Sequence, residues 1–152
     1  MPGENRRAID MGISGGSFGR DLELSEEILV EATSAFFEGM REPDGPVWDS
    51  VLDPDILCES PVGSHPTIGI QALRDQFGVL ALRWQQVSVS ENDLHLCGRR
   101  VAATFDITVR DILDDTHGTS GIAIIGLTGE GLISSVELWW DVGQLLPHPS
   151  RD

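Results

Sequence analysis

One stretch of this sequence decides how the rest is interpreted: Glu59-Ser60-Pro61-Val62-Gly63-Ser64-His65-Pro66. Its prolines, glycine and serines predict a turn across Pro61–Pro66. The residues just before the turn, Ile56–Ser60, are predicted to form a short strand. After it, Gly69–Leu80 is predicted to be a helix, because apolar residues recur there on one face: Ile70, Leu73, Phe77 and Leu80. The stretch therefore joins a strand to a helix.

Two further helices are predicted upstream. The first begins after Ser25, a good N-cap followed by two glutamates, and continues to about Arg41 with one apolar face. A break rich in proline and glycine follows, and a short helix is predicted over Val47–Leu52. Residues 1–22 contain several glycines and little periodicity, so we interpret them as a flexible N-terminal arm.

Downstream of the third helix the hydrophobic period changes to two, which indicates strands. Turns are predicted at Asp114–Gly118 and Thr128–Gly131, and they separate four long segments: a bulged strand over Trp84–Cys97, then Arg100–Leu113, Thr119–Leu127 and Leu132–Asp141. This order predicts an α+β fold in which three N-terminal helices pack on a strongly curved antiparallel sheet and leave a cone-shaped pocket. We expect one domain over residues 23–143 and a loose C-terminal tail over 144–152.

The composition excludes several kinds of chemistry. The chain of 152 residues has a formal net charge of −15, and all ten of its basic residues are arginine. Without lysine there is no Schiff-base catalysis, and without tyrosine no phenol can stabilise an oxyanion. The negative charge repels phosphate backbones and anionic membranes, so we expect neither nucleic acid nor a membrane as a partner.

The cysteines and histidines lack the spacing of a metal site. Cys58 and Cys97 are isolated, and the four histidines show no ligand pattern: His65, His95, His117 and His148. We therefore expect no metal and no other cofactor. The first twenty residues contain no apolar signal-peptide core, and no apolar run is long enough to span a bilayer. Both observations favour a cytoplasmic protein with reduced thiols.

The Pro61–Pro66 turn resembles the Asp-Pro-Val-Gly-Ser-x-Pro segment of bacterial ketosteroid isomerases. The order helix, helix, strand, turn, helix is similar too, as is the ending Gly129-x-Gly131-Leu132-Ile133-x-x-x-x-Leu138-Trp139-Trp140. On these residues the chain resembles the SnoaL-like and ketosteroid-isomerase-like family of the nuclear-transport-factor-like (NTF2-like) superfamily, over about Leu24–Asp141. The resemblance implies a homodimer formed through the outer face of the sheet.

The same resemblance implies that the usual catalytic groups are absent. The isomerases use a tyrosine, a general-base aspartate and a protonated aspartic acid. Aligned on the turn, Ser60 takes the place of the base, Phe36 that of the tyrosine and Ala123 that of the second acid. Neither a base nor an oxyanion-binding pair remains at these positions, so the alignment disfavours isomerase chemistry.

Strand alternation and the resemblance together predict the lining of the pocket. Its walls are expected to be mostly apolar, with contributions from helices and strands: Phe36, Trp48, Cys58, Phe77, Ala123, Ile125, Val136, Leu138 and Trp140. Trp139 follows the opposite parity to Trp140 and should lie on the outer face, where it fits a dimer interface.

The second long strand leaves two alternatives open. Its apolar set is Val101, Ala103, Phe105, Ile107 and Val109, and the intervening residues are mostly polar. The pattern alone buries the apolar set against the helices. The family alignment instead places Thr104, Asp106 and Thr108 in the pocket, where Asp106 would be the best acid or base because burial would raise its pKa.

Two other residues are candidates for chemistry. Ser60 shares parity with Cys58 and should face inward, either to orient a substrate oxygen or to line the wall, since neither has a sequence partner that suggests a triad. Glu59 should point outward, but a register slip of one residue would bring it in as an alternative base. His65 and His95 are interpreted as a loop residue and a strand-face residue.

The resemblance thus implies a polyketide-tailoring cyclase that acts on a small apolar intermediate in secondary metabolism. Ring closure could depend on shape alone, as in a pericyclic [4+2] reaction, or on acid–base assistance. Two alternatives stay open: an epoxide hydrolase or isomerase of the same superfamily, and a non-catalytic module that binds a small ligand or a partner.

Overall fold

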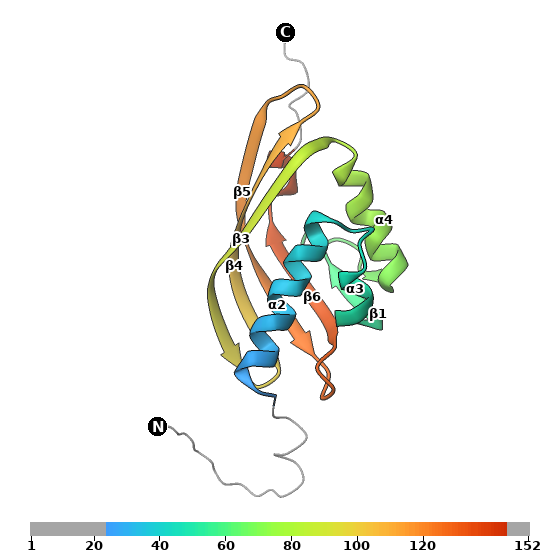
Figure 1. The fold of residues 1–152 in the computed structure, drawn as a ribbon, viewed down its shortest axis with the longest axis vertical. Helices are drawn as coiled ribbons and strands as arrows, with labels where there is room; N and C mark the ends of the chain where they lie inside the picture. Colours follow the sequence, from blue (N-terminus) through green and yellow to red (C-terminus); the bar gives the residue numbers. More distant parts are fainter. Residues whose placement is uncertain (1–23, 146–152) are drawn as a thin grey trace, which may run out of the picture.

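The structure, a computed structural model, describes residues 24–145 (Figure 1). Helices α2 (Glu26–Arg41), α3 (Val47–Val51) and α4 (Ile70–Ala81) lie on one side of a six-stranded sheet. Over these described residues the architecture is therefore α+β with three α-helices, as the sequence predicts. The predicted N-terminal arm lies outside the described residues. None of the described helices is long and apolar enough to cross a membrane.

Local sequence explains where the helices begin and which face they bury. The Ser25 side chain accepts a hydrogen bond from the Ile28 N–H at 3.2 Å, and thus caps α2 as predicted. Helix α2 buries its apolar stripe, including Phe36 and Phe37. Helix α4 follows Gly69, whose φ of 96° suits glycine, and it buries Leu73 and Phe77.

The sheet has the order β2-β1-β6-β5-β4-β3. Its strands are β1 (Leu52–Glu59), β2 (Thr67–Ile68), β3 (Trp84–Cys97), β4 (Arg100–Asp111), β5 (Thr116–Leu127) and β6 (Ile133–Trp140). All neighbours are antiparallel except β1 and β6, which pair in parallel. The predicted purely antiparallel sheet is therefore wrong. A parallel pair needs a long connection, and here β2, α4, β3, β4 and β5 all lie between β1 and β6 in the chain.

The turn between β4 and β5 lies earlier than predicted. Strand β5 begins at Thr116, so His117 and Gly118 belong to a strand and not to a turn. Asp111 fixes this turn because its Oδ1 accepts hydrogen bonds from the Leu113 and Asp115 N–H groups at 2.9 and 3.0 Å. The predicted loose tail also begins too early, because a 3-10 helix, η1 (Val142–Leu145), ends with the buried side chain of Leu145.

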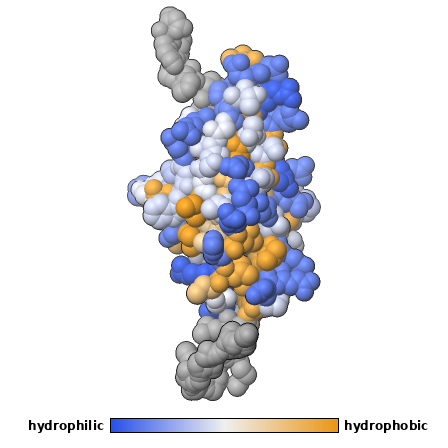
Figure 2. All heavy atoms as spheres, turned by 90° about the vertical axis from the view of Figure 1, so that its left-hand side faces the viewer, coloured by the Kyte–Doolittle hydropathy of each residue, from blue (hydrophilic) through white to orange (hydrophobic). Residues whose placement is uncertain are grey.

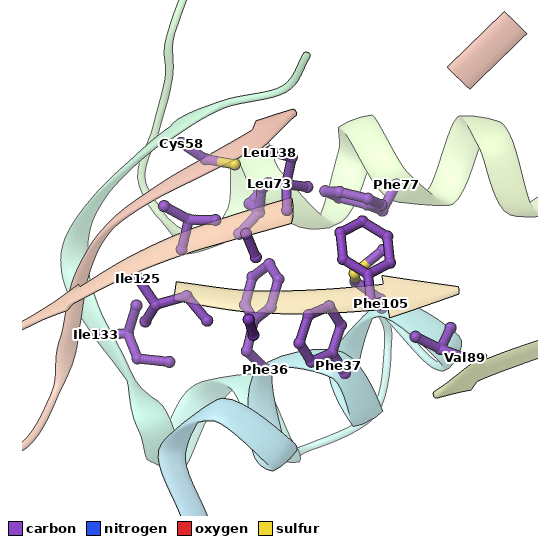
Figure 3. Close-up of a cluster of buried hydrophobic side chains, with 14 of the residues drawn as sticks. Phe36, Phe37, Cys58, Leu73, Phe77, Val89, Phe105, Ile125, Ile133 and Leu138 are labelled. Carbon is purple, nitrogen blue, oxygen red and sulfur yellow. The ribbon is translucent and has the colours of Figure 1, made fainter. Parts of the chain in front are cut away.

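The core lies between the helices and the sheet, and it decides between the two alternatives for β4 (Figure 3). The apolar set faces the helices and is at most 1% exposed: Val101, Ala103, Phe105, Ile107 and Val109. Thr104, Asp106 and Thr108 face the other side, so their predicted place in the pocket is wrong. Burial of each large side chain contributes about 1.5–3 kcal/mol, and the polar set offers no comparable gain.

Candidate functional site

Six aromatic side chains form a closed circuit of contacts inside the molecule. Their ring centroids lie 5.1–6.2 Å apart in the order Phe36, Trp48, Phe77, Trp140, Phe105 and Phe37, and back to Phe36. They come from all three helices and from β4 and β6, so the circuit joins both layers of the fold. Gly39 of α2 leaves room for Trp48, since a Cβ at that position would lie 2.0 Å from the indole Nε1.

Side chains fill this interior. Five of the six rings are at most 1% exposed, and Trp140 is 8% exposed. Ala123, Ile125, Val136 and Leu138 are also buried there, on the side where the family resemblance places them. The predicted pocket-lining residues of this set are therefore brought together in the structure, although the space between them is occupied by their own side chains. Their contact with a ligand stays a prediction.

Ser60 is a polar residue at one edge of the aromatic circuit. Its hydroxyl oxygen accepts a buried hydrogen bond of 3.0 Å from the Trp140 indole N–H, and its backbone carbonyl accepts one from the Gln76 side chain. No acceptor for the Ser60 hydroxyl proton is found within residues 24–145. The hydroxyl can therefore orient a ligand oxygen by donating to it, but it has no adjacent base that would make it a nucleophile.

Cys58 and Glu59 offer little acid–base capacity to the interior. Cys58 is fully buried, and burial, followed by the charge of Glu59, raises the pKa of its thiol to about 12. Glu59 points to the outer side and accepts a hydrogen bond of 3.1 Å from the Gly63 N–H. The register slip that would bring Glu59 inside does not occur, because Ile56, Cys58 and Ser60 all face inward.

Asp106 lies on the outer face of β4 and is exposed. Its carboxylate accepts hydrogen bonds from the Ser120 hydroxyl and from the Asn92 side chain, and these bonds lower its pKa. The prediction of a buried acid with a raised pKa is therefore wrong. Thr104 is also used on this face, where its hydroxyl accepts from the Asp93 N–H at 2.9 Å.

The sequence interpretation missed a carboxylate–imidazole pair on the inner face. Asp111 Oδ2 lies 2.7 Å from His117 Nε2, and the Asp111 side chain is fully buried. The hydrogen bond with His117, and then that from the Asp115 N–H, lower the pKa of Asp111. One signal could have revealed the pair: Asp111 continues the inward alternation of Val101–Val109, and a buried carboxylate needs partners.

The 3-10 helix η1 covers part of the inner face of the sheet beside the Asp111–His117 pair. The Thr119 hydroxyl donates to the side chain of Gln144 at 2.7 Å, and the Trp84 indole N–H donates to the Leu145 carbonyl at 3.3 Å. Helix η1 thus crosses from β5 towards β3. Trp84 is also the register partner of Asp111, so η1 lies next to the Asp111–His117 pair.

Residues 24–145 contain no group of three or more histidine, cysteine, aspartate or glutamate side chains that could hold a metal ion. The site consists of an apolar interior, the hydroxyl of Ser60 at its edge, and the Asp111–His117 pair further along the same face of the sheet.

The chain was compared with known proteins. No family model matches it, and no curated protein matches it by sequence. Several solved structures do match the chain. A protein described as a SnoaL-like polyketide cyclase from Jannaschia sp. CCS1 is 14% identical, with 84% of this chain and 99% of that chain covered at a TM-score of 0.69. TsrD from Streptomyces laurentii is 19% identical, with coverage of 81% and 95% and a TM-score of 0.68.

The epoxide hydrolase/cyclase-like enzyme SalBIII, which is linked to pyran ring formation in the polyether salinomycin, is 22% identical. The match covers 79% of this chain and 95% of that chain, at a TM-score of 0.64. At these identities the comparisons establish the architecture of the chain. The chain therefore has the fold of the SnoaL-like and NTF2-like superfamily.

Proposed function

We propose that this protein is a cofactor-independent cyclase that closes a ring in a largely apolar, polyketide-type intermediate of secondary metabolism. The aromatic circuit between the helices and the sheet carries this proposal. The proposed ring closure is an isomerisation, because the substrate and the cyclic product contain the same atoms. We place the reaction in the cytoplasm, where the free thiols Cys58 and Cys97 would stay reduced.

The interior would act by selecting a folded conformer of a flexible chain. Holding reacting atoms in contact can remove about 7–11 kcal/mol of entropic and solvent-reorganisation cost from a ring closure. Since side chains fill the interior, a substrate would open a cone-shaped pocket by moving some of the rings. Trp140 is the most exposed ring of the circuit, and its bond to Ser60 would be exchanged for a contact with a substrate oxygen.

Two of the structural neighbours support a cyclase. One is described as a polyketide cyclase, and SalBIII is linked to pyran ring formation. Epoxide hydrolysis is the competing chemistry, since a neighbour from Mycobacterium tuberculosis is an epoxide hydrolase of the LEH-like kind. It needs a carboxylate that activates water. Asp106 lies on the outer face of β4, and the inward Asp111 has both carboxylate oxygens engaged by Leu113, Asp115 and His117.

We also propose that two copies pair through the outer face of the sheet. Trp139 and Ile122 are 53% and 44% exposed there, and they line an open groove of about 430 Å³ with Asp106. Figure 2 looks onto the outer face of the sheet, which lies away from the helices. Hydrophobic residues gather in the lower half of that view. Light scattering on the purified protein tests the pairing: Trp139→Ser should give a monomer, whereas an unchanged oligomeric state would refute it.

A metabolite comparison by mass spectrometry tests the proposed activity in the native host, with and without the gene. Loss of a cyclic product, with an uncyclised species of equal mass accumulating, supports the cyclase. If the lost product is one water heavier than the accumulating species, the protein is a hydrolase. An unchanged profile contradicts both and favours a binding module.

A matched pair of variants shows whether the interior is the site. Trp140→Leu and Trp139→Leu change adjacent tryptophans that face opposite sides of the sheet. When each variant is returned to the deleted strain, Trp139→Leu should restore the cyclic product and Trp140→Leu should not. Equal restoration by both would exclude the aromatic circuit as the substrate site.

A further inference from the structure

We propose that His117, positioned by Asp111, is the acid–base residue of the ring closure. The substrate of the cyclase would carry a hydroxyl group that adds to a carbon–carbon double bond conjugated with a carbonyl group. This inference rests on the proposed cyclase function and gives it a reacting group. It uses a pair of side chains that the family's catalytic positions, at Ser60, Phe36 and Ala123, do not include.

Asp111 is built to orient an imidazole. One carboxylate oxygen is occupied by the Leu113 and Asp115 N–H groups, and the other lies 2.7 Å from His117 Nε2. A fully buried carboxylate with three such bonds stays ionised and cannot rotate away. It therefore fixes the ring orientation of His117, places the proton of the neutral imidazole on Nε2, and stabilises the imidazolium when the ring takes up a second proton.

His117 leaves its other nitrogen free for a ligand. Within the described residues, Nδ1 has no hydrogen-bond partner, and with the proton on Nε2 it carries the lone pair. His117 is the register partner of the buried Val109, so it lies on the inner face of β5. Its side chain is 15% exposed, which leaves an approach for a ligand while limiting contact with bulk water.

The pair lies within reach of the aromatic circuit along one strand. Gly121 of β5 is the register partner of Trp140, and His117 precedes Gly121 by four residues on the same face. Four residues of strand span about 13 Å. Thr119, which lies between His117 and Gly121 on this face, is hydrogen-bonded to Gln144 of η1. A substrate with its apolar chain among the rings would therefore present a polar end to His117 by displacing η1.

One base is sufficient for this addition. Nδ1 takes the proton of the substrate hydroxyl while the oxygen lone pair forms the new C–O bond at the β-carbon. The π electrons of the double bond move towards the carbonyl group and give an enolate. The imidazolium then returns the proton to the α-carbon, which forms a C–H bond, so the product is an isomer of the substrate. Asp111 remains ionised throughout.

The test uses the uncyclised species that accumulates in the gene-deleted host, purified and offered to the purified full-length protein. The wild type should give a cyclic isomer in water. In D2O the product should gain one deuterium at the α-carbon, since the imidazolium proton comes from solvent. His117→Gln should lower kcat by about 10²–10⁴-fold. His95→Gln, a histidine exposed on β3, is the matched control and should leave kcat unchanged.

Two further variants separate catalysis from structure. Free imidazole should restore part of the activity of His117→Ala, and it should have no effect on the wild type. Asp111→Asn should lower kcat more than it changes KM, because the amide holds the ring without stabilising its charge. If His117→Gln does not fold, imidazole rescue of His117→Ala and the kcat of Asp111→Asn decide, because deuterium at the α-carbon shows conjugate addition but not which group moves the proton.

The outcomes distinguish this inference from the proposed function. A cyclic isomer without deuterium, or a folded His117→Gln as active as the wild type, would overturn the role of His117 and leave a shape-driven cyclase. Failure of the wild type to convert the accumulated species would overturn the cyclase and the inference together. Deuterium at the α-carbon with a slow, imidazole-rescued His117→Ala supports both.

Discussion

Two aspartates of β4, five residues apart, have opposite surroundings. Asp106 is exposed on the outer face and is held by the side chains of Ser120 and Asn92. Asp111 is fully buried on the inner face, and its partners are His117 and two backbone N–H groups. An odd separation along a strand always puts two residues on opposite faces. The face, more than the residue type, decides which carboxylate belongs to the interior.

The largest difference between the two faces should appear in thiol chemistry. Cys58 is buried with a pKa of about 12, whereas Cys97 on β3 is exposed. We expect a thiol reagent to label Cys97 quickly and Cys58 more than about a thousandfold more slowly, since Cys58 reacts only after the core opens. Mass spectrometry of the labelled native protein measures both rates. Equal rates would mean that the interior is open.

The next effect is on stability. Phe105→Ala removes an inward ring that contacts Phe37 and Trp140, and it should cost about 3–5 kcal/mol of unfolding free energy. Thr108→Ala on the outer face is the matched change, and it should stay within about 0.5 kcal/mol of the wild type. Urea unfolding measures both values. A smaller loss for Phe105 than for Thr108 would reverse the assignment of the faces.

Removal of each carboxylate in turn should lower the melting temperature by different amounts on the two faces. Asp111→Ala leaves the Leu113 and Asp115 N–H groups without a partner and should lower the melting temperature by several degrees. Asp106→Ala loses only exposed side-chain bonds and should lower it by less than about one degree. Equal melting temperatures for the two variants would show that the turn after β4 does not depend on Asp111.

The smallest expected effect is a change in acid stability. The pKa of Asp111 is lowered in the folded protein, so its ionised form stabilises the fold above the unfolded value of about 4. This contribution is lost as the pH falls through the lower folded-state value. Asp111→Asn should therefore lose less stability than the wild type on acidification, as measured by urea unfolding at several pH values. If Asp111→Asn lost stability more steeply than the wild type on acidification, folding would not lower the pKa of Asp111.

Most of the fold could be predicted from local signals. Ser25, the helical spacing around Phe77 and the alternation of β4 gave the helices and long strands to within a few residues. The parallel pairing of β1 with β6 could not be predicted, because no local pattern records a partner so distant in the chain.

The candidate site was harder to predict for two physical reasons. Alternation separates two faces of β4 but does not say which one the helices cover, and the family alignment chose the wrong one for Asp106. His117 follows Asp114-Asp115-Thr116, residues typical of turns, and so was assigned to the turn. Only the tertiary contact with Asp111 reveals that the strand has already begun.

The central claim is that the chemistry depends on the inner face of the sheet. It is tested most directly by returning Asp111→Asn or Asp106→Asn to the gene-deleted host and measuring the cyclic product by mass spectrometry. We predict that Asp106→Asn restores the product to the wild-type level, and that Asp111→Asn restores less than about a tenth of it. Full restoration by Asp111→Asn, or loss of the product with Asp106→Asn, would contradict the account.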